Sequence, residues 1–282
     1  MVGVGLLGAK CPHDRMAQKL RKGFQSYFPQ IELEILAMKK TLSVVSAALA
    51  ITALPQLVHA EDNPLSFNVT LTSDYRYRGI SQTRLKPALQ VGVDYALPAG
   101  FYIGAWASNI KWIKDAGGDA NVEIDVYGGY KGEIAKDLTY DVGVLTYIYP
   151  SNNLNPSADT TEIYGAVTYG PATLKYSHSV TRLFGFLSSR NSGYLDLTAT
   201  FDVGDGIQLI PHVGYQKVRS NSDFSYTDYS MTVGKDFSGF FLSAAIVGTS
   251  TKSPGGLPAY YYAPDDKNLG KTGLVVAVKK TF

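Results

Sequence analysis

The strongest constraint on the fold is an alternation of apolar and polar residues that recurs from Leu65 to the end of the chain. In the first such segment Phe67, Val69 and Leu71 alternate with polar residues. Successive side chains of a β-strand point to opposite faces, so this alternation predicts strands with one apolar and one polar face. Twelve segments of this kind lie near residues 65–77, 89–95, 101–110, 122–127, 138–144, 160–169, 172–182, 194–203, 206–218, 226–237, 239–249 and 272–282.

The connections between these segments differ in length on the two sides. After even-numbered segments most are short turns, such as "PAG" at 98–100, whereas after odd-numbered segments they are long and polar, as at 250–270. A Greek-key sandwich does not sort its loops in this way, but outer-membrane barrels do. The predicted fold class is therefore all-β, a transmembrane antiparallel up-and-down β-barrel of about 12 strands. We expect Leu65–Tyr77 to pair with Gly273–Phe282 and close the barrel.

Residues 38–60 have the pattern of a secretory signal, although they lie inside the chain. Two lysines follow Met38, an apolar stretch covers residues 42–54, and "VHA" at 58–60 fits a signal-peptidase site. The apolar stretch is shorter than the roughly 20 residues that a membrane-spanning helix needs. The sequence thus predicts three parts, which are a misannotated upstream extension at 1–37, a signal peptide at 38–60 and an outer-membrane β-barrel at 61–282.

Charge and cysteine content exclude several functions. Residues 1–60 hold 7 of the 26 basic and 3 of the 24 acidic residues, which leaves 19 and 21 and a net charge of −2 for the rest. No basic stripe remains, so we expect no nucleic-acid partner. The single cysteine, Cys11, lies before the barrel, which leaves no disulfide and no thiolate metal ligand. We expect no cofactor, no metal site and no catalytic residue, and we predict that the protein is not an enzyme.

Aromatic residues and the C-terminus indicate the bacterial outer membrane as the location. Interfacial girdles of aromatic side chains are typical of membrane barrels. The C-terminal "GLVVAVKKTF" resembles the signature that barrel-assembly machinery recognises, so we expect that partner to bind through Phe282, alongside outer-membrane lipid and small solutes. The tyrosines expected at the outer rim are Tyr75, Tyr77, Tyr147, Tyr194, Tyr215 and Tyr226. The aromatics expected at the inner rim are Tyr95, Phe101, Tyr102, Tyr130, Tyr140, Tyr169, Phe237, Phe240 and Phe282.

The polar face of the strands carries most of the charge. Barrels of about 8 strands are filled by side chains and those of 16–18 leave an open channel, so about 12 strands leaves two interpretations open. Either the inner charges pair in a packed interior, or they line a narrow aqueous path that favours cations, with Asp74, Asp94, Glu123 and Asp125 contributing most. The candidate lumen-lining residues are Asp74, Arg76, Asp94, Glu123, Asp125, Asp141, Glu162, Lys175, Asp196, Asp228 and Lys279.

Three functions remain open from the sequence. The first is a porin-like channel for the passive passage of small solutes. The second is a non-conducting structural or surface-binding barrel, in which the loop 250–270 with Tyr260, Tyr261 and Tyr262 binds a ligand or folds inward as a constriction. The third is an outer-membrane lipid hydrolase using His178 on the lipid side, but no nucleophile is identified beside it, which favours an interfacial histidine without a catalytic role.

Several stretches resemble a known family. They are "SDYRYRGISQT" (73–83), "PALQVGVDYALPAGFYIGAWASN" (87–109), "EIDVYGGY" (123–130) and "YIYP" (147–150). In these stretches the chain resembles the TorF family of porins, which are conserved hypothetical outer-membrane proteins of Gcw type. The resemblance covers most of 61–282 and implies a Gram-negative outer-membrane barrel. It implies little about the solute, because a shared fold does not fix a function.

Overall fold

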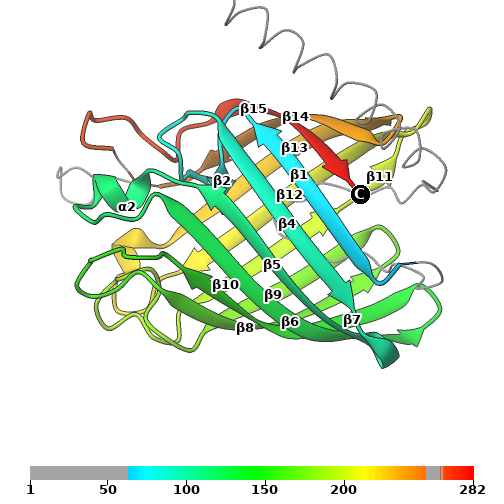
Figure 1. The fold of residues 1–282 in the computed structure, drawn as a ribbon, viewed down its shortest axis with the longest axis horizontal. Helices are drawn as coiled ribbons and strands as arrows, with labels where there is room; N and C mark the ends of the chain where they lie inside the picture. Colours follow the sequence, from blue (N-terminus) through cyan, green and yellow to red (C-terminus); the bar gives the residue numbers. More distant parts are fainter. Residues whose placement is uncertain (1–62, 252–260, 262) are drawn as a thin grey trace, which may run out of the picture. The chain divides into compact units, whose positions relative to one another are not determined.

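The chain folds into a closed antiparallel β-barrel (Figure 1). The computed structural model describes residues 63–251, 261 and 263–282. Each of twelve strands is hydrogen-bonded to the next one along the ring, which closes where β1 pairs with β15. The ring consists of β1 (Leu65–Thr72), β4 (Ala88–Ala96), β5 (Phe101–Asn109), β6 (Val122–Ala135), β7 (Leu138–Ile148), β8 (Thr160–Tyr169), β9 (Ala172–Ser179), β10 (Gly193–Ala199), β12 (Ile207–Lys217), β13 (Tyr226–Phe237), β14 (Phe240–Thr249) and β15 (Gly273–Thr281).

The predicted fold class and the predicted closing pair are confirmed. Thr70 of β1 lies opposite Lys279 of β15 on one side and opposite Gln90 of β4 on the other. The short strand β11 (Phe201–Asp202) continues the line of β10 alongside β12. One boundary is wrong, because β1 ends at Thr72 and does not reach Tyr77.

The barrel has an apolar outer face and a polar inner face. In β13 the side chains of Tyr229, Met231 and Val233 are exposed, whereas those of Asp228 and Thr232, at alternate positions, are buried. A water-soluble protein buries its large aliphatic side chains, so this inverted pattern suits a surrounding lipid phase. Every strand of the ring exposes at least one such residue, as shown by Leu71, Leu89, Ile103, Val126, Val144, Val167, Leu174, Leu197, Val213, Val233, Leu242 and Val276.

The two ends of the barrel differ. One end carries tight turns, among them the 3-10 turn η1 (Pro98–Gly100) between β4 and β5. The other end carries the long loops, which include helix α2 (Trp112–Asp115) and the 3-10 turn η2 (Ser222–Phe224). Here Ile113 and Tyr149 are buried in a hydrophobic cluster between loops, so the loops form a packed layer. No helix within the described ranges is long and apolar enough to cross a membrane.

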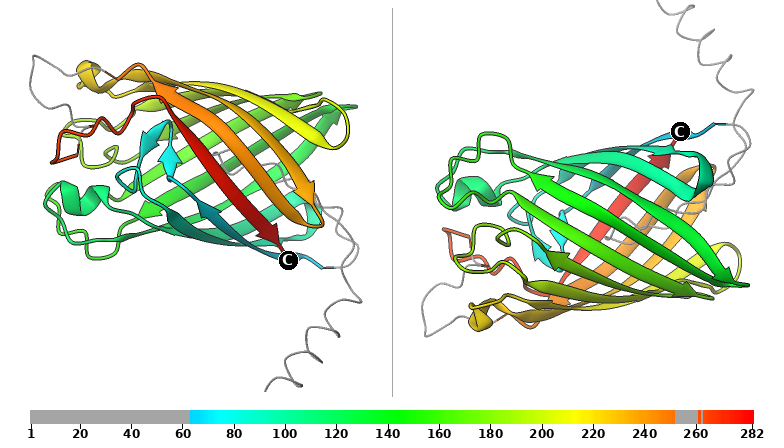
Figure 2. Two further views of the ribbon diagram at one scale, coloured as in Figure 1. Left: turned by 90° about the horizontal axis from the view of Figure 1, so that it is seen from above. Right: turned by 90° about the horizontal axis from the view of Figure 1, so that it is seen from below.

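Between β1 and β4 the chain leaves the barrel wall and folds into the interior. Residues 73–83 form this inner hairpin, which includes the paired strands β2 (Arg76–Tyr77) and β3 (Ile80–Ser81). Its side chains reach three separate strands of the ring, namely Glu123 of β6, Glu162 of β8 and Gln216 of β12. A segment that touches strands on several sides of a closed ring lies inside it, and in both views of Figure 2 the short cyan strands β2 and β3 lie within the outline of the barrel.

Part of the predicted aromatic girdle is wrong, because several of its tyrosines contact the inner hairpin or other interior side chains. Five of the six tyrosines expected at the outer rim face the interior or are covered by other side chains. The hydroxyl of Tyr75 donates to Glu123, and that of Tyr77 donates to Tyr147 at 2.6 Å. Tyr194 and Tyr226 are buried as well, and among the inner-rim residues Tyr102 is buried. Inside the barrel, carboxylates accept hydrogen bonds from several of these tyrosine hydroxyls. These hydrogen bonds stabilise the tyrosines more than a position in the interfacial girdle would.

Candidate solute cavity in the barrel lumen

Arg78 anchors the inner hairpin to the barrel wall. Its Nη1 donates to Oε1 of Glu162 at 3.1 Å and its Nη2 donates to Oε2 at 2.6 Å. Nη1 also donates to Gln216, and the guanidinium lies 4.2 Å from the centroid of the Tyr194 ring. The pair with Glu162 is two-pronged and both side chains are almost fully buried, so it fixes position and orientation together.

The charge on Arg78 persists despite its burial. Burial alone lowers the pKa of this guanidinium, but the charge of Glu162 and the neighbouring tyrosine hydroxyls raise it by more. The pKa of Arg78 therefore lies above its ordinary value, and the guanidinium carries its positive charge inside the barrel.

A second buried pair holds the base of the inner hairpin. Arg76 Nε donates to Asp74 at 2.5 Å, and its Nη1 donates to the carbonyls of Gly79, Leu269 and Lys271. The other oxygen of Asp74 accepts hydrogen bonds from the Ser81 and Thr83 hydroxyls. Both charges are thus satisfied within the hairpin and the last long loop, which makes Asp74 unavailable to a passing ion.

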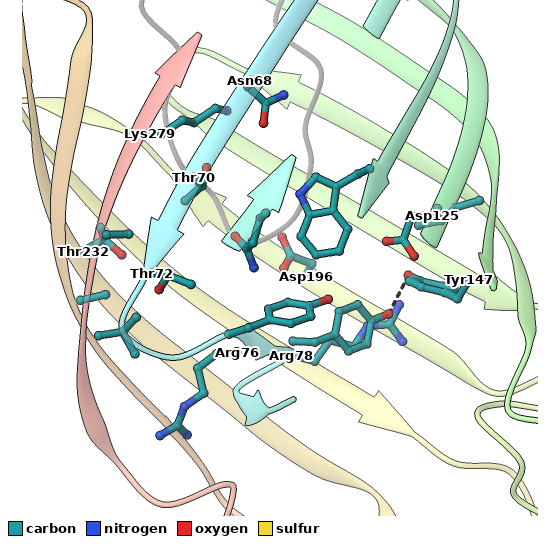
Figure 3. A pocket seen from close by; sticks show the side chains of 18 of the residues that line it. Asn68, Thr70, Thr72, Arg76, Arg78, Asp125, Tyr147, Asp196, Thr232 and Lys279 are labelled. Carbon is teal, nitrogen blue, oxygen red and sulfur yellow. Dashed lines mark hydrogen bonds between the residues drawn. The ribbon is translucent and has the colours of Figure 1, made fainter. Parts of the chain in front are cut away.

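Between the inner hairpin and the barrel wall lies a cavity of about 240 Å³ (Figure 3). Its lining includes the aromatic side chains of Trp106, Tyr127, Tyr147 and Tyr164, together with hydroxyl groups such as Thr70. The charged residues that line it are Asp74, Arg76, Arg78, Asp94, Asp125, Lys175, Asp196 and Lys279. Side chains with both signs of charge and aromatic faces surround a space large enough for a small organic molecule.

Four cavity-lining charges belong to none of the ion pairs of the described residues. Asp94 accepts a hydrogen bond from the Tyr127 hydroxyl at 2.5 Å. The Lys175 ammonium lies 4.1 Å from the centroid of the Tyr164 ring. Lys279 and Asp125 are the other two. A charge without a protein counter-ion is the kind that acts on a solute.

The structure places the predicted lumen-lining residues in two groups. Asp74, Arg76, Asp94, Asp125, Lys175, Asp196 and Lys279 line the cavity. The other four lie buried in contacts with interior side chains, and these are Glu123 with Tyr75, Asp141 with Tyr102, Glu162 with Arg78 and Asp228 with Tyr194. The role of all these predicted residues along a water-filled path stays a prediction.

Sequence reasoning missed two interior groups. Arg78 lies in the turn of the inner hairpin with a positive φ of 45°, so no strand alternation could place it. Nε2 of His212 donates a hydrogen bond to Oδ2 of Asp196 at 2.6 Å, and Nδ1 of the same ring lies 3.7 Å from Asp228. The signal for His212 was available, because it alternates with the exposed Val213 and shares its face with the buried Gln216.

Two further candidates occupy other places. His178 contacts the Tyr176 hydroxyl at 3.3 Å and Asn191 at 3.2 Å on the exposed side of the barrel. In the loop 250–270, Tyr261 is buried and donates to the Phe224 carbonyl, whereas Tyr260 and Tyr262 lie outside the described residues. Among the described residues, the inner hairpin is a segment that reaches into the lumen, and whether the loop folds inward stays a prediction.

Comparison with solved structures finds matches of low sequence identity, each with a TM-score below 0.5. The KdgM porin in complex with disordered oligogalacturonate has a TM-score of 0.49 and 8% identity, with 77% of this chain and 98% of that chain covered. The NanC porin has a TM-score of 0.48 and 9% identity, with the same coverage. The outer membrane protein OprD from Pseudomonas aeruginosa has a TM-score of 0.37 and 11% identity over 78% of this chain and 65% of its own.

Comparison with curated proteins gives no match. One family model does match, over residues 59–282, which is the barrel together with the inner hairpin. Its description is "Bacterial protein of unknown function (Gcw_chp)", in agreement with the Gcw type that the motifs at 73–83 and 87–109 predict. This chain therefore belongs to the Gcw_chp family of bacterial proteins of unknown function.

Proposed function

We propose that this protein is a narrow outer-membrane channel for the passive passage of small polar solutes, as the TorF-type porin resemblance implies. The observation that carries the proposal is a charged cavity of about 240 Å³ inside a closed barrel whose outer face is apolar. Only a closed ring of strands satisfies every backbone polar group in hydrocarbon, and only a polar lumen gives solutes a path across it.

The remaining parts of the proposal concern export and assembly. The signal at 38–60 lies outside the described residues, and export through it stays a prediction. The C-terminal residue, Phe282, exposes its ring and exchanges two backbone hydrogen bonds with Phe67 of β1. An exposed terminal aromatic at the closing seam is accessible to the assembly machinery, so we propose that this machinery recognises Phe282.

Charge selectivity is the property that tests the channel most directly. In planar bilayers we expect discrete current steps with little charge selectivity, because the carboxylates of Asp94 and Asp125 are balanced by the ammonium groups of Lys175 and Lys279 in the same cavity. The double variant Asp94→Asn and Asp125→Asn is expected to shift the reversal potential towards a preference for anions. The matched variant Lys279→Gln, which removes a positive charge from the same cavity, is expected to shift it towards a preference for cations.

A non-conducting barrel is the second candidate function, and the inner hairpin favours it. This hairpin fills part of the lumen with buried side chains, among them Arg78 and Ser81. If folded protein in a bilayer gives no current under any applied voltage, this second function replaces the channel.

A substitution on the apolar outer face tests whether the barrel is inserted in a membrane. Val233 of β13 is exposed on the apolar outer face. Val233→Arg is expected to lower the free energy of unfolding from lipid vesicles by about 2–4 kcal/mol, the cost of a basic residue at the bilayer midplane. Val233→Leu serves as the control and is expected to change it by less than about 1 kcal/mol. Equal stability of the two variants in urea titrations would mean that β13 does not face lipid.

A further inference from the structure

The strongest unexplained feature of the cavity is the surroundings of Asp125. Asp125 lies in β6, directly opposite Trp106 of β5 on one side and Tyr147 of β7 on the other. Directly opposite residues of antiparallel strands share a face, and all three line the cavity. Figure 3 shows the Asp125 carboxylate and the Tyr147 ring next to each other at the cavity wall. The result is a carboxylate between two aromatic side chains.

One oxygen of the Asp125 carboxylate lacks a hydrogen-bond partner. Its Oδ1 is buried and has no hydrogen-bond partner within the described part of the chain. The same holds for Oε2 of Glu123, two residues earlier on the same face of β6. The guanidinium of Arg78, which lines the same cavity, is already paired with Glu162. A carboxylate with such an oxygen carries a large free-energy cost unless it binds a cation or a proton.

The aromatic side chains select the kind of cation. Trp106 packs edge to face against Tyr75 with a centroid distance of 5.3 Å, and Tyr147 packs in the same way against Tyr77 at 5.5 Å. Aromatic faces beside an anion attract alkylammonium groups, because the ring quadrupole and the apolar area both favour them. A hard metal ion needs about six oxygen ligands, and the described residues contain no group of three acidic, histidine or cysteine side chains that could hold one.

We propose that the cavity binds a small organic amine, whose ammonium group pairs with Asp125 between Trp106 and Tyr147. The inference rests on the proposed channel function and names its solute class. The cavity volume of about 240 Å³ is below the roughly 300–1,000 Å³ of drug-sized pockets, so the ligand is a small one. Lys175 and Lys279 line other parts of the same cavity, which leaves room there for a polar or anionic group on the amine.

Tryptophan fluorescence provides a direct test in purified, folded protein in micelles. The chain has two tryptophans, so Trp112→Phe leaves Trp106 as the sole reporter. Titration of this variant with n-butylammonium is expected to give a saturable change in emission, whereas neutral n-butanol gives none. Adding Asp125→Asn is expected to weaken binding by about tenfold or more, the effect of losing one charged hydrogen bond.

Asp141→Asn is the matched control, because Asp141 is a buried carboxylate of the adjacent strand that is bonded to Tyr102 and does not line the cavity. It is expected to keep the affinity within about twofold. Equal binding to the Asp125→Asn variant, equal binding of n-butanol, or no saturable binding at all would overturn the proposal. The titration needs no membrane, so binding without current would refute the channel alone, and current without binding would refute the amine site alone.

Discussion

Displacement of the inner hairpin is expected to raise the single-channel conductance several-fold. Gly79 lies at the tip of the hairpin with a φ of +77°, and a Cβ there would lie 2.8 Å from the Cβ of Asp228 and 2.5 Å from Cγ2 of Thr249. Gly79→Val therefore combines backbone strain with a collision against the barrel wall. The hairpin can relieve the strain and the collision only by moving away from the barrel wall, and this movement opens the part of the lumen that it fills.

Gly170→Val is the matched control for this experiment. Gly170 also has a positive φ, of +55°, but it lies in the turn between β8 and β9 and nothing lies within 4 Å of its added Cβ. This variant introduces comparable backbone strain without touching the hairpin, so we expect its conductance to equal that of the wild type. A Gly79→Val protein that is folded, judged by its circular dichroism, yet conducts like the wild type would show that the hairpin does not limit the path.

Loss of the Arg78 side chain is expected to be the most destabilising single change in the lumen. Arg78→Met leaves the Glu162 carboxylate buried without its two-pronged partner, a change that costs about 3–5 kcal/mol in buried ion pairs. The variant also removes the contact with Tyr194 and the hydrogen bond to Gln216. Urea unfolding in lipid vesicles measures the change in the free energy of unfolding.

Arg84→Met is the comparison for the same measurement. Arg84 pairs with Asp115 in the loop layer, where its side chain is 26% exposed. A partly exposed pair contributes about 0–1 kcal/mol, so this variant is expected to lose far less stability than Arg78→Met. Adding Glu162→Leu to Arg78→Met is expected to recover part of the loss, since the unpaired charge left by the first substitution is then removed. Similar losses for the two arginine variants would mean that the Arg78 pair adds nothing beyond an ordinary surface pair.

The alternation of apolar and polar residues determined the barrel itself. Residues two positions apart share one face of a strand, and their polarity decides which face contacts lipid. This pattern can be seen within a short stretch of sequence. The strand pattern, the short turns on one side and the long loops on the other therefore predicted the closed ring and the pairing of β1 with β15. The family likewise followed from continuous motifs, of which residues 73–83 are the most specific.

Only the tertiary structure decided what fills the ring. The sequence extends the first strand to Tyr77. In the structure the chain instead turns inward, and Arg76 forms hydrogen bonds with Asp74 and with the last long loop. Arg78 meets Glu162 and Gln216 across 84 and 138 residues of sequence, respectively. Contacts inside a barrel join strands that are neighbours in space and not in sequence, and no local period encodes them. For the same reason the unpaired Asp125 between Trp106 and Tyr147 becomes visible only when three strands lie side by side.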